Sequence, residues 1–134
     1  MSENLELVRS ICEPWARGDF SSSDWVHPEI EFVIADGPAP GRWIGLGGLI
    51  DGFRQVLSAY DDYHTVAEEF RELDSERILK FHHYSGRGKT SGLEIEQMTT
   101  AKGADLFHIR RGKVRRLVIY FDPANALADL GLKE

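Results

Sequence analysis

Residues 84–92, YSGRGKTSG, contain the Gly-Lys-Thr sequence that closes a phosphate-binding P-loop. A P-loop also needs a leading glycine, which would fall at His83, and a helix directly after the loop to bind the phosphate. The residues that follow, GLEIEQ, alternate like a strand instead. Because both requirements fail, this stretch predicts a glycine-rich hairpin turn with Lys89 and Thr90 at its exposed tip.

Asp105 is a stronger candidate for chemistry. It lies in GADLFHI with the same alternation as Phe107 and Ile109, which should face the core. A buried carboxylate is costly unless it is paired or protonated, so an inward Asp105 is a candidate acid or base with a raised pKa. The alternative is that Gly103 bulges the strand and turns Asp105 out to solvent.

The dipeptide His82–His83 offers a second titratable group. Neighbouring side chains of a strand point to opposite faces, so the two rings cannot bind one metal from a regular strand, and no metal site is predicted. If Leu79 and Phe81 point inward, His83 does too and His82 points outward. An inward His83 is either a proton-transfer group or a hydrogen-bonded core histidine.

The bulk composition restricts the class of protein. The 134 residues match the usual size of one domain and carry a net charge of −6, which argues against a general nucleic-acid or anionic-membrane binder. The single cysteine, Cys12, allows no internal disulfide, and no apolar run is long enough to span a membrane. Without a signal-peptide pattern at the start, a cytoplasmic location is expected.

Charge is unevenly distributed along the chain. Residues 61–76 are mostly acidic and residues 107–116 are basic. The two segments are either solvated strand faces or complementary patches at a subunit contact.

The elements that must position these groups begin with a helix over 3–17, whose apolar stripe includes Leu5, Val8, Cys12 and Trp15. The segment SSSDWV predicts a short second helix, HPEIEFVI (27–34) a strand, and 35–43 a loop. A second long helix is predicted over 45–60.

The second half of the chain has strand periodicity. Four strands are predicted, at 64–73, 77–86, 92–110 and 113–121, and their short connections imply an antiparallel meander. A bulge or bend is expected at Gly103. A final helix should begin after Asp122 and stop at Gly131. The pattern is that of an α+β domain spanning 1–134, with helices on one face of the sheet.

Several stretches resemble the nuclear-transport-factor-two-like fold in its SnoaL-like branch. They are PWARGDF, HPEIEF, GLGGLIDGF, GRGKTSGLEIE and, most specifically, LFHIRRGKVRRLVIYFDPANALADLGL. The resemblance covers essentially the whole chain. It implies a cone-shaped half-barrel, in which a curved antiparallel sheet wraps around N-terminal helices and a short helix ends the chain. It also implies an apolar internal pocket and a homodimer formed through the outer sheet face.

The resemblance does not extend to a known catalytic set. Ketosteroid isomerase-like members have an Asp base where this chain has Val33 or Phe32, a Tyr at the position of Ile11, and an acid at the position of Asp105. SnoaL-like cyclases have an Asp at the position of Ile119 and a His at the position of Asp105. The sequence therefore resembles the fold rather than one characterised enzyme.

Two functions follow as expectations. The first is a small-molecule pocket protein that transfers a proton on an apolar carbonyl or polyketide-like substrate, as an isomerase or cyclase does, without a cofactor. Asp105 and His83 would be its catalytic residues. The ligand-binding residues would be Trp15, Phe32, Phe53, Gln97 and Ile119. The alternative is a non-catalytic ligand-binding or dimerisation module.

Overall fold

A computed structural model describes residues 2–37, 40–58, 60–88 and 102–132 of the protein. The predicted Lys89–Thr90 tip and the inward Gln97 lie outside these described residues. In chain order the elements are α1 (Glu3–Trp15), β1 (Val26–Ile34), β2 (Gly41–Ile44), α2 (Gly45–Leu57), β3 (Tyr60–Glu72), β4 (Arg77–Gly88), β5 (Lys102–Arg110), β6 (Lys113–Tyr120) and α3 (Pro123–Leu130).

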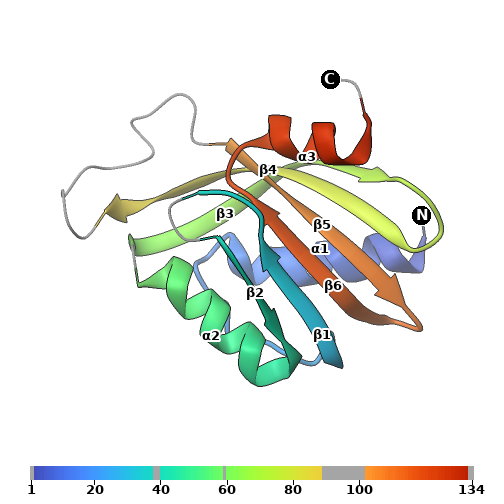
Figure 1. Cartoon of the computed structure of the whole chain (residues 1–134), viewed down its shortest axis with the longest axis horizontal. Coiled ribbons are helices and arrows are strands. Elements are labelled where there is room, and N and C mark those ends of the chain that lie inside the picture. Colours follow the sequence, from blue (N-terminus) through green and yellow to red (C-terminus); the bar gives the residue numbers. More distant parts are fainter. Residues whose placement is uncertain (1, 38–39, 59, 89–101, 133–134) are drawn as a thin grey trace.

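The strands form one curved, unclosed sheet in the order β2-β1-β6-β5-β4-β3 (Figure 1). The four strands from β3 to β6 make the predicted antiparallel meander. β1 joins the far side of β6 in a parallel pair and has β2 antiparallel on its other side. The α+β cone with N-terminal helices and a short C-terminal helix is therefore confirmed.

The sheet buries both of its faces over the central strands. On the face covered by α1 and α2, a large core gathers around Val8, Trp15, Phe32, Phe107 and Leu117. The opposite face carries a smaller core beneath α3, formed by Leu79, Ala104, Leu106, Val118, Tyr120 and Ala126. The prediction that the helices cover one face only is therefore wrong for α3. Figure 1 shows this arrangement, with α1 passing behind the sheet and α3 along its upper edge. Two apolar faces make the inward direction of a strand ambiguous from sequence alone.

The first half of the chain departs from prediction at two places. Residues 21–25 form no helix, because Ser21 and Ser22 donate their hydroxyl hydrogen bonds to Asp19 and Asp24 and so compete with helical bonding. The predicted loop over 35–43 contains part of an edge strand, since Gly41–Ile44 pairs with β1. The stripe of α1 is confirmed, with Val8, Cys12 and Trp15 buried.

The second half departs at Gly103, where a bulge was expected. Pairing between β4 and β5 runs regularly through Gly103, and the register shift of β5 against β6 lies between His108 and Ile109 instead. The last helix is as predicted, because the Asp122 carboxylate accepts a hydrogen bond from the backbone N–H of Ala124 and Gly131 ends the helix in the left-handed conformation.

The acidic and basic segments meet within the chain. The Glu76 carboxylate lies 3.1 Å from His108 Nε2 and 3.4 Å from Arg110 Nε. Exposed pairs of this kind contribute little to stability.

No helix among the described residues has the length and hydropathy to cross a membrane.

Candidate functional site

A small cavity lies between the end of α1, the end of α2 and the concave face of the sheet. Its apolar wall consists of Trp15, Phe20, Phe53, Val56, Leu57 and Ile119. The rings of Trp15, Phe20 and Phe53 contact one another, with centroids between 5.6 and 6.1 Å apart. The volume is about 20 Å³, which is the room that one ordered water needs.

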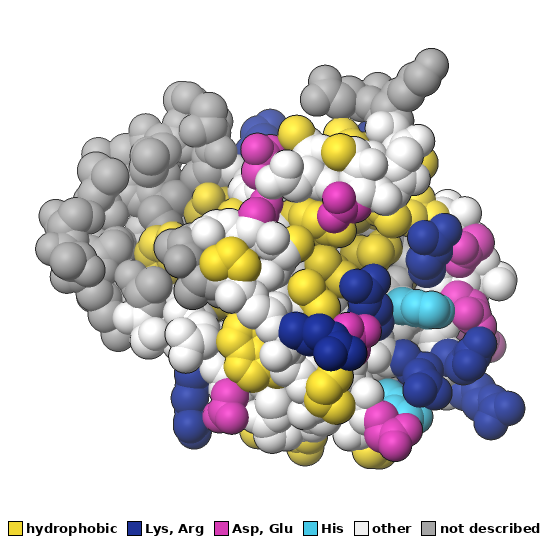
Figure 2. Space-filling view, in the orientation of Figure 1, with side chains coloured by type: hydrophobic (Ala, Val, Ile, Leu, Met, Phe, Trp, Pro, Cys, Tyr) yellow, Lys and Arg dark blue, Asp and Glu magenta, His cyan; other side chains and the backbone are white. Residues whose placement is uncertain are grey.

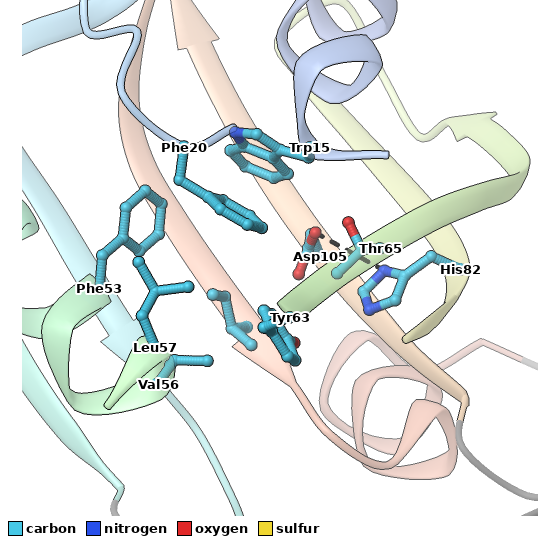
Figure 3. A pocket seen from close by; sticks show the side chains of 10 residues that line it. Trp15, Phe20, Phe53, Val56, Leu57, Tyr63, Thr65, His82 and Asp105 are labelled. Carbon is cyan, nitrogen blue, oxygen red and sulfur yellow. Dashed lines mark ion pairs between the residues drawn. The ribbon is translucent and has the colours of Figure 1, made fainter. Parts of the chain in front are cut away.

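Four polar side chains from the strands complete the cavity wall. They are Tyr63 and Thr65 of β3, His82 of β4 and Asp105 of β5. Figure 3 shows Asp105 and His82 side by side, facing the aromatic wall. Thr65, His82 and Asp105 are each less than 5% exposed, so any molecule in the cavity would meet these groups away from bulk water.

Lys80 supplies the counter-charge for Asp105. Its Nζ donates hydrogen bonds to Asp105 Oδ2 at 3.1 Å and to Thr65 Oγ1 at 3.2 Å. The two residues are direct cross-strand partners, and Lys80 is fully buried. An inward Asp105 is one of the two directions that the sequence leaves open, and the ion pair with Lys80 is not predicted from it.

His82 is held in its neutral form. Burial is the largest cause, and it lowers the pKa of His82 to about 4, although the nearby Asp105 carboxylate acts in the opposite direction. Nδ1 lies 3.6 Å from Asp105 Oδ2, too far for a hydrogen bond, and has no hydrogen-bond partner among the described residues. A buried ring nitrogen without a partner is costly, so a bound molecule that hydrogen-bonds to it would be favoured.

The lowered pKa of His82 predicts a loss of stability in acid. As pH falls below about 6.5, the unfolded chain takes up the proton before the folded one, so the free energy of unfolding should fall by about 2 kcal/mol between pH 7 and pH 5. Urea denaturation at both pH values measures this. His82→Gln should remove the loss and His83→Gln should keep it. Equal losses in wild type and His82→Gln would contradict the assignment.

Gly103 makes room for the His82 ring. A Cβ atom at position 103 would lie 2.8 Å from His82 Nε2 and 2.8 Å from the backbone oxygen of Tyr120. No side chain fits there unless the ring or the strand moves. The glycine therefore serves close packing against His82 and does not bend the strand.

The structure brings together four of the predicted site residues, Asp105, Trp15, Phe53 and Ile119, at the cavity. Phe32 is buried one layer away, with its ring 5.0 Å from that of Phe53, and does not line the cavity. The prediction that His83 points inward is wrong. Its side chain is 45% exposed and lies 3.6 Å from Glu68. The alternation was misread because Leu79 faces the smaller core under α3, which leaves Lys80 and His82 on the cavity side.

Sequence reasoning missed His82, Thr65, Tyr63, Phe20 and Lys80. One available signal was the opposite charge of Lys80 and Asp105, because such pairs often face each other across neighbouring strands. Using it requires the register of the two strands, which the predicted turn does not fix, because the described part of β4 ends at Gly88 and β5 begins at Lys102.

Two other titratable groups beside the site stay protonated at neutral pH. Burial raises the pKa of the Cys12 thiol to about 12, which suits the inert packing role expected for it. Burial also raises the pKa of Tyr63 well above its ordinary value. Tyr63 lines the cavity and keeps its hydroxyl proton, so its hydroxyl is a hydrogen-bond donor. Within the described ranges, no three His, Cys, Asp or Glu side chains gather as metal ligands.

Comparisons with known proteins give structural matches only. No family model and no curated protein sequence matches the chain. An NTF2-like protein of unknown function from Burkholderia pseudomallei has a TM-score of 0.75 at 21% identity and covers 96% of this chain and 97% of its own. TerC, crystallised with polyporic acid, has a TM-score of 0.71 at 21% identity, covering 96% and 98%.

A Jannaschia protein described as a SnoaL-like polyketide cyclase has a TM-score of 0.70 at 12% identity, with 98% of this chain and 93% of its own covered. A protein of ketosteroid isomerase-like fold from Catenulispora acidiphila, in complex with trimethylamine, also matches. Identities this low establish shape and not chemistry. This chain has the NTF2-like fold that the SnoaL-like and ketosteroid isomerase-like structures share.

Proposed function

We propose that this protein binds a small apolar or aromatic carbonyl compound, polyketide-like in character, and transfers a proton on it as an isomerase or cyclase does. The observation that carries the proposal is His82 Nδ1, a buried ring nitrogen without a hydrogen-bond partner among the described residues, beside Asp105 at an aromatic cavity. His82 thus replaces His83 as the second proton-transfer group.

The roles follow from the protonation states. Neutral His82 would accept a proton from the carbon next to the substrate carbonyl, leaving an enolate. The Asp105 carboxylate would stabilise the imidazolium that forms, and the protonated Tyr63 hydroxyl would donate to the enolate oxygen. In a substrate whose carbon–carbon double bond is conjugated with the enolate, return of the proton from His82 to the far carbon of that system gives an isomer with the double bond moved.

The small cavity would take only the reacting end of the substrate. A larger outer groove of about 410 Å³ shares Leu57 and Tyr63 with the cavity wall, and its other lining residues are Arg17, Gly18, Tyr60, Asp62 and His64. The body of the ligand would lie in this groove, with its carbonyl reaching past Leu57 and Tyr63. The binding of polyporic acid by TerC is consistent with a small aromatic ligand in this fold.

Exchange of carbon-bound hydrogen tests the proposal. In deuterated buffer, wild type should speed deuterium uptake at the carbons beside the carbonyl of 2-tetralone, followed by NMR. His82→Gln should slow this exchange by about a hundredfold or more, as loss of a general base does. The matched control His83→Gln, on the neighbouring exposed residue, should behave as wild type.

Equal rates for His82→Gln and His83→Gln would reject proton transfer by His82. Binding of 2-tetralone without any exchange would favour the alternative, a non-catalytic ligand-binding module. The ion pair of Asp105 with Lys80 is the observation that favours this alternative, because it neutralises the acid.

We also propose that the protein forms a homodimer. In the space-filling view, hydrophobic side chains gather on the sheet beside α3 and cationic ones at the β5–β6 hairpin (Figure 2), which supports a homodimer through the outer sheet face. Sedimentation as a 15.2 kDa monomer at micromolar concentration would contradict the dimer. A cytoplasmic location is likewise proposed.

A further inference from the structure

The group around Asp105 has the composition of a site for an organic cation. A carboxylate beside aromatic ring faces is an arrangement that binds ammonium groups, since both carry negative potential toward the ligand. Here Asp105 is 2% exposed, and the Trp15 ring stacks with the rings of Phe20 and Phe107 at centroid distances of 5.6 and 6.0 Å.

The cation in this site belongs to the protein. Lys80 Nζ lies 5.0 Å from the centroid of the Trp15 ring, in addition to its hydrogen bonds with Asp105 and Thr65. Two N–H groups of the ammonium are thus hydrogen-bonded to side-chain oxygens, and the Trp15 ring lies beside it. Lys80 itself does not line the cavity, whereas Asp105, Thr65 and Trp15 all do. The ammonium therefore lies directly behind the cavity wall.

We propose that Lys80 acts as a tethered ligand of an aromatic–carboxylate cation site, and so makes the adjoining cavity selective for neutral molecules. A second cation would have to leave water for a carboxylate that Lys80 already pairs, while an anion would meet Asp105 at the wall. The selectivity rests on the proposed function, since it assumes that the cavity holds the ligand. The assignment of Lys80 as the ligand of the cation site does not depend on the proposed function.

Chemical rescue tests the cation site without reference to turnover. Lys80→Ala removes the propylammonium part of the side chain, so n-propylammonium chloride should bind in its place and raise the melting temperature of this variant. At ten times its dissociation constant it should shift the unfolding equilibrium about tenfold. The neutral match 1-propanol, and sodium chloride at equal ionic strength, should not. Wild type and Lys80→Ala/Asp105→Asn should gain nothing from propylammonium.

Two outcomes would overturn the cation site. One is a Lys80→Ala protein that gains as much from 1-propanol as from propylammonium. The other is a double variant that gains as much as the single one. If Lys80→Ala is unfolded on its own, recovery of its circular dichroism with propylammonium becomes the readout. The cation site is then overturned if propylammonium does not restore the signal, or if 1-propanol restores it as well.

The selectivity is tested on wild type with two molecules of the same shape. Neutral 2-tetralone should bind, and the cation 2-aminotetralin should not displace it, as followed by saturation-transfer NMR. Displacement by 2-aminotetralin at equal concentration would reject the selectivity. If 2-tetralone does not bind at all, the proposed function fails, and the propylammonium result still decides the nature of the Lys80 site.

Discussion

Replacing Lys80 by methionine should lower the free energy of unfolding by about 3–5 kcal/mol, because the change leaves the Asp105 carboxylate buried without a partner. Methionine nearly matches the shape of the lysine stem, so the loss would report charge more than packing. Urea denaturation at pH 7 measures it.

The matched control for Lys80→Met is Lys102→Met, on the next strand and exposed, which should change stability by no more than about 0.5 kcal/mol. The double variant Lys80→Met/Asp105→Leu should regain most of the loss, since apolar pairs often replace buried ion pairs without cost. If the double variant is as unstable as the single one, packing around Lys80 and not its charge determines the effect.

Replacing Trp15 by alanine should also lower the free energy of unfolding by about 3–5 kcal/mol. Trp15 is 3% exposed and contacts the rings of Phe20, Phe53 and Phe107 as well as the Lys80 ammonium. Its removal would leave a void between α1 and the sheet. Chemical denaturation gives the value.

Trp43→Ala is the matched control for Trp15, because Trp43 lies half-buried on the edge strand β2. Solvent already reaches that ring, so less apolar surface is lost and the destabilisation should be clearly smaller. Losses of equal size would show that the aromatic cluster has no special weight in the fold.

Most of the fold could be predicted from local signals. The stripe of α1, the meander from β3 to β6 and the caps of α3 each depend on neighbouring residues, and all three are confirmed. The parallel pairing of β1 with β6 depends on residues far apart in the chain, for which a single sequence holds no direct signal. The edge strand β2 was missed for the same reason, since its pairing with β1 and not its composition makes it a strand.

The candidate site was predictable only in part. On β5, alternation with Phe107 favours an inward Asp105 against the alternative of a bulge at Gly103, and Asp105 is buried. On β4, Ile78 and Leu79 are both buried, on opposite faces, so alternation alone could not decide which histidine faces the cavity. Lys80 was overlooked because a lysine in a strand ordinarily points to water.

The two buried faces of β5 have a mechanical consequence. Asp105 and Phe107 point to the cavity side, while Ala104 and Leu106, which alternate with them, pack under α3. The short final helix α3 thus supports the strand that bears the Asp105 carboxylate, although no residue of α3 lines the cavity. A shift of α3 against the sheet would therefore move β5 and change the position of the Asp105 carboxylate. Substitutions in α3, which does not line the cavity, are expected to alter the site in this way.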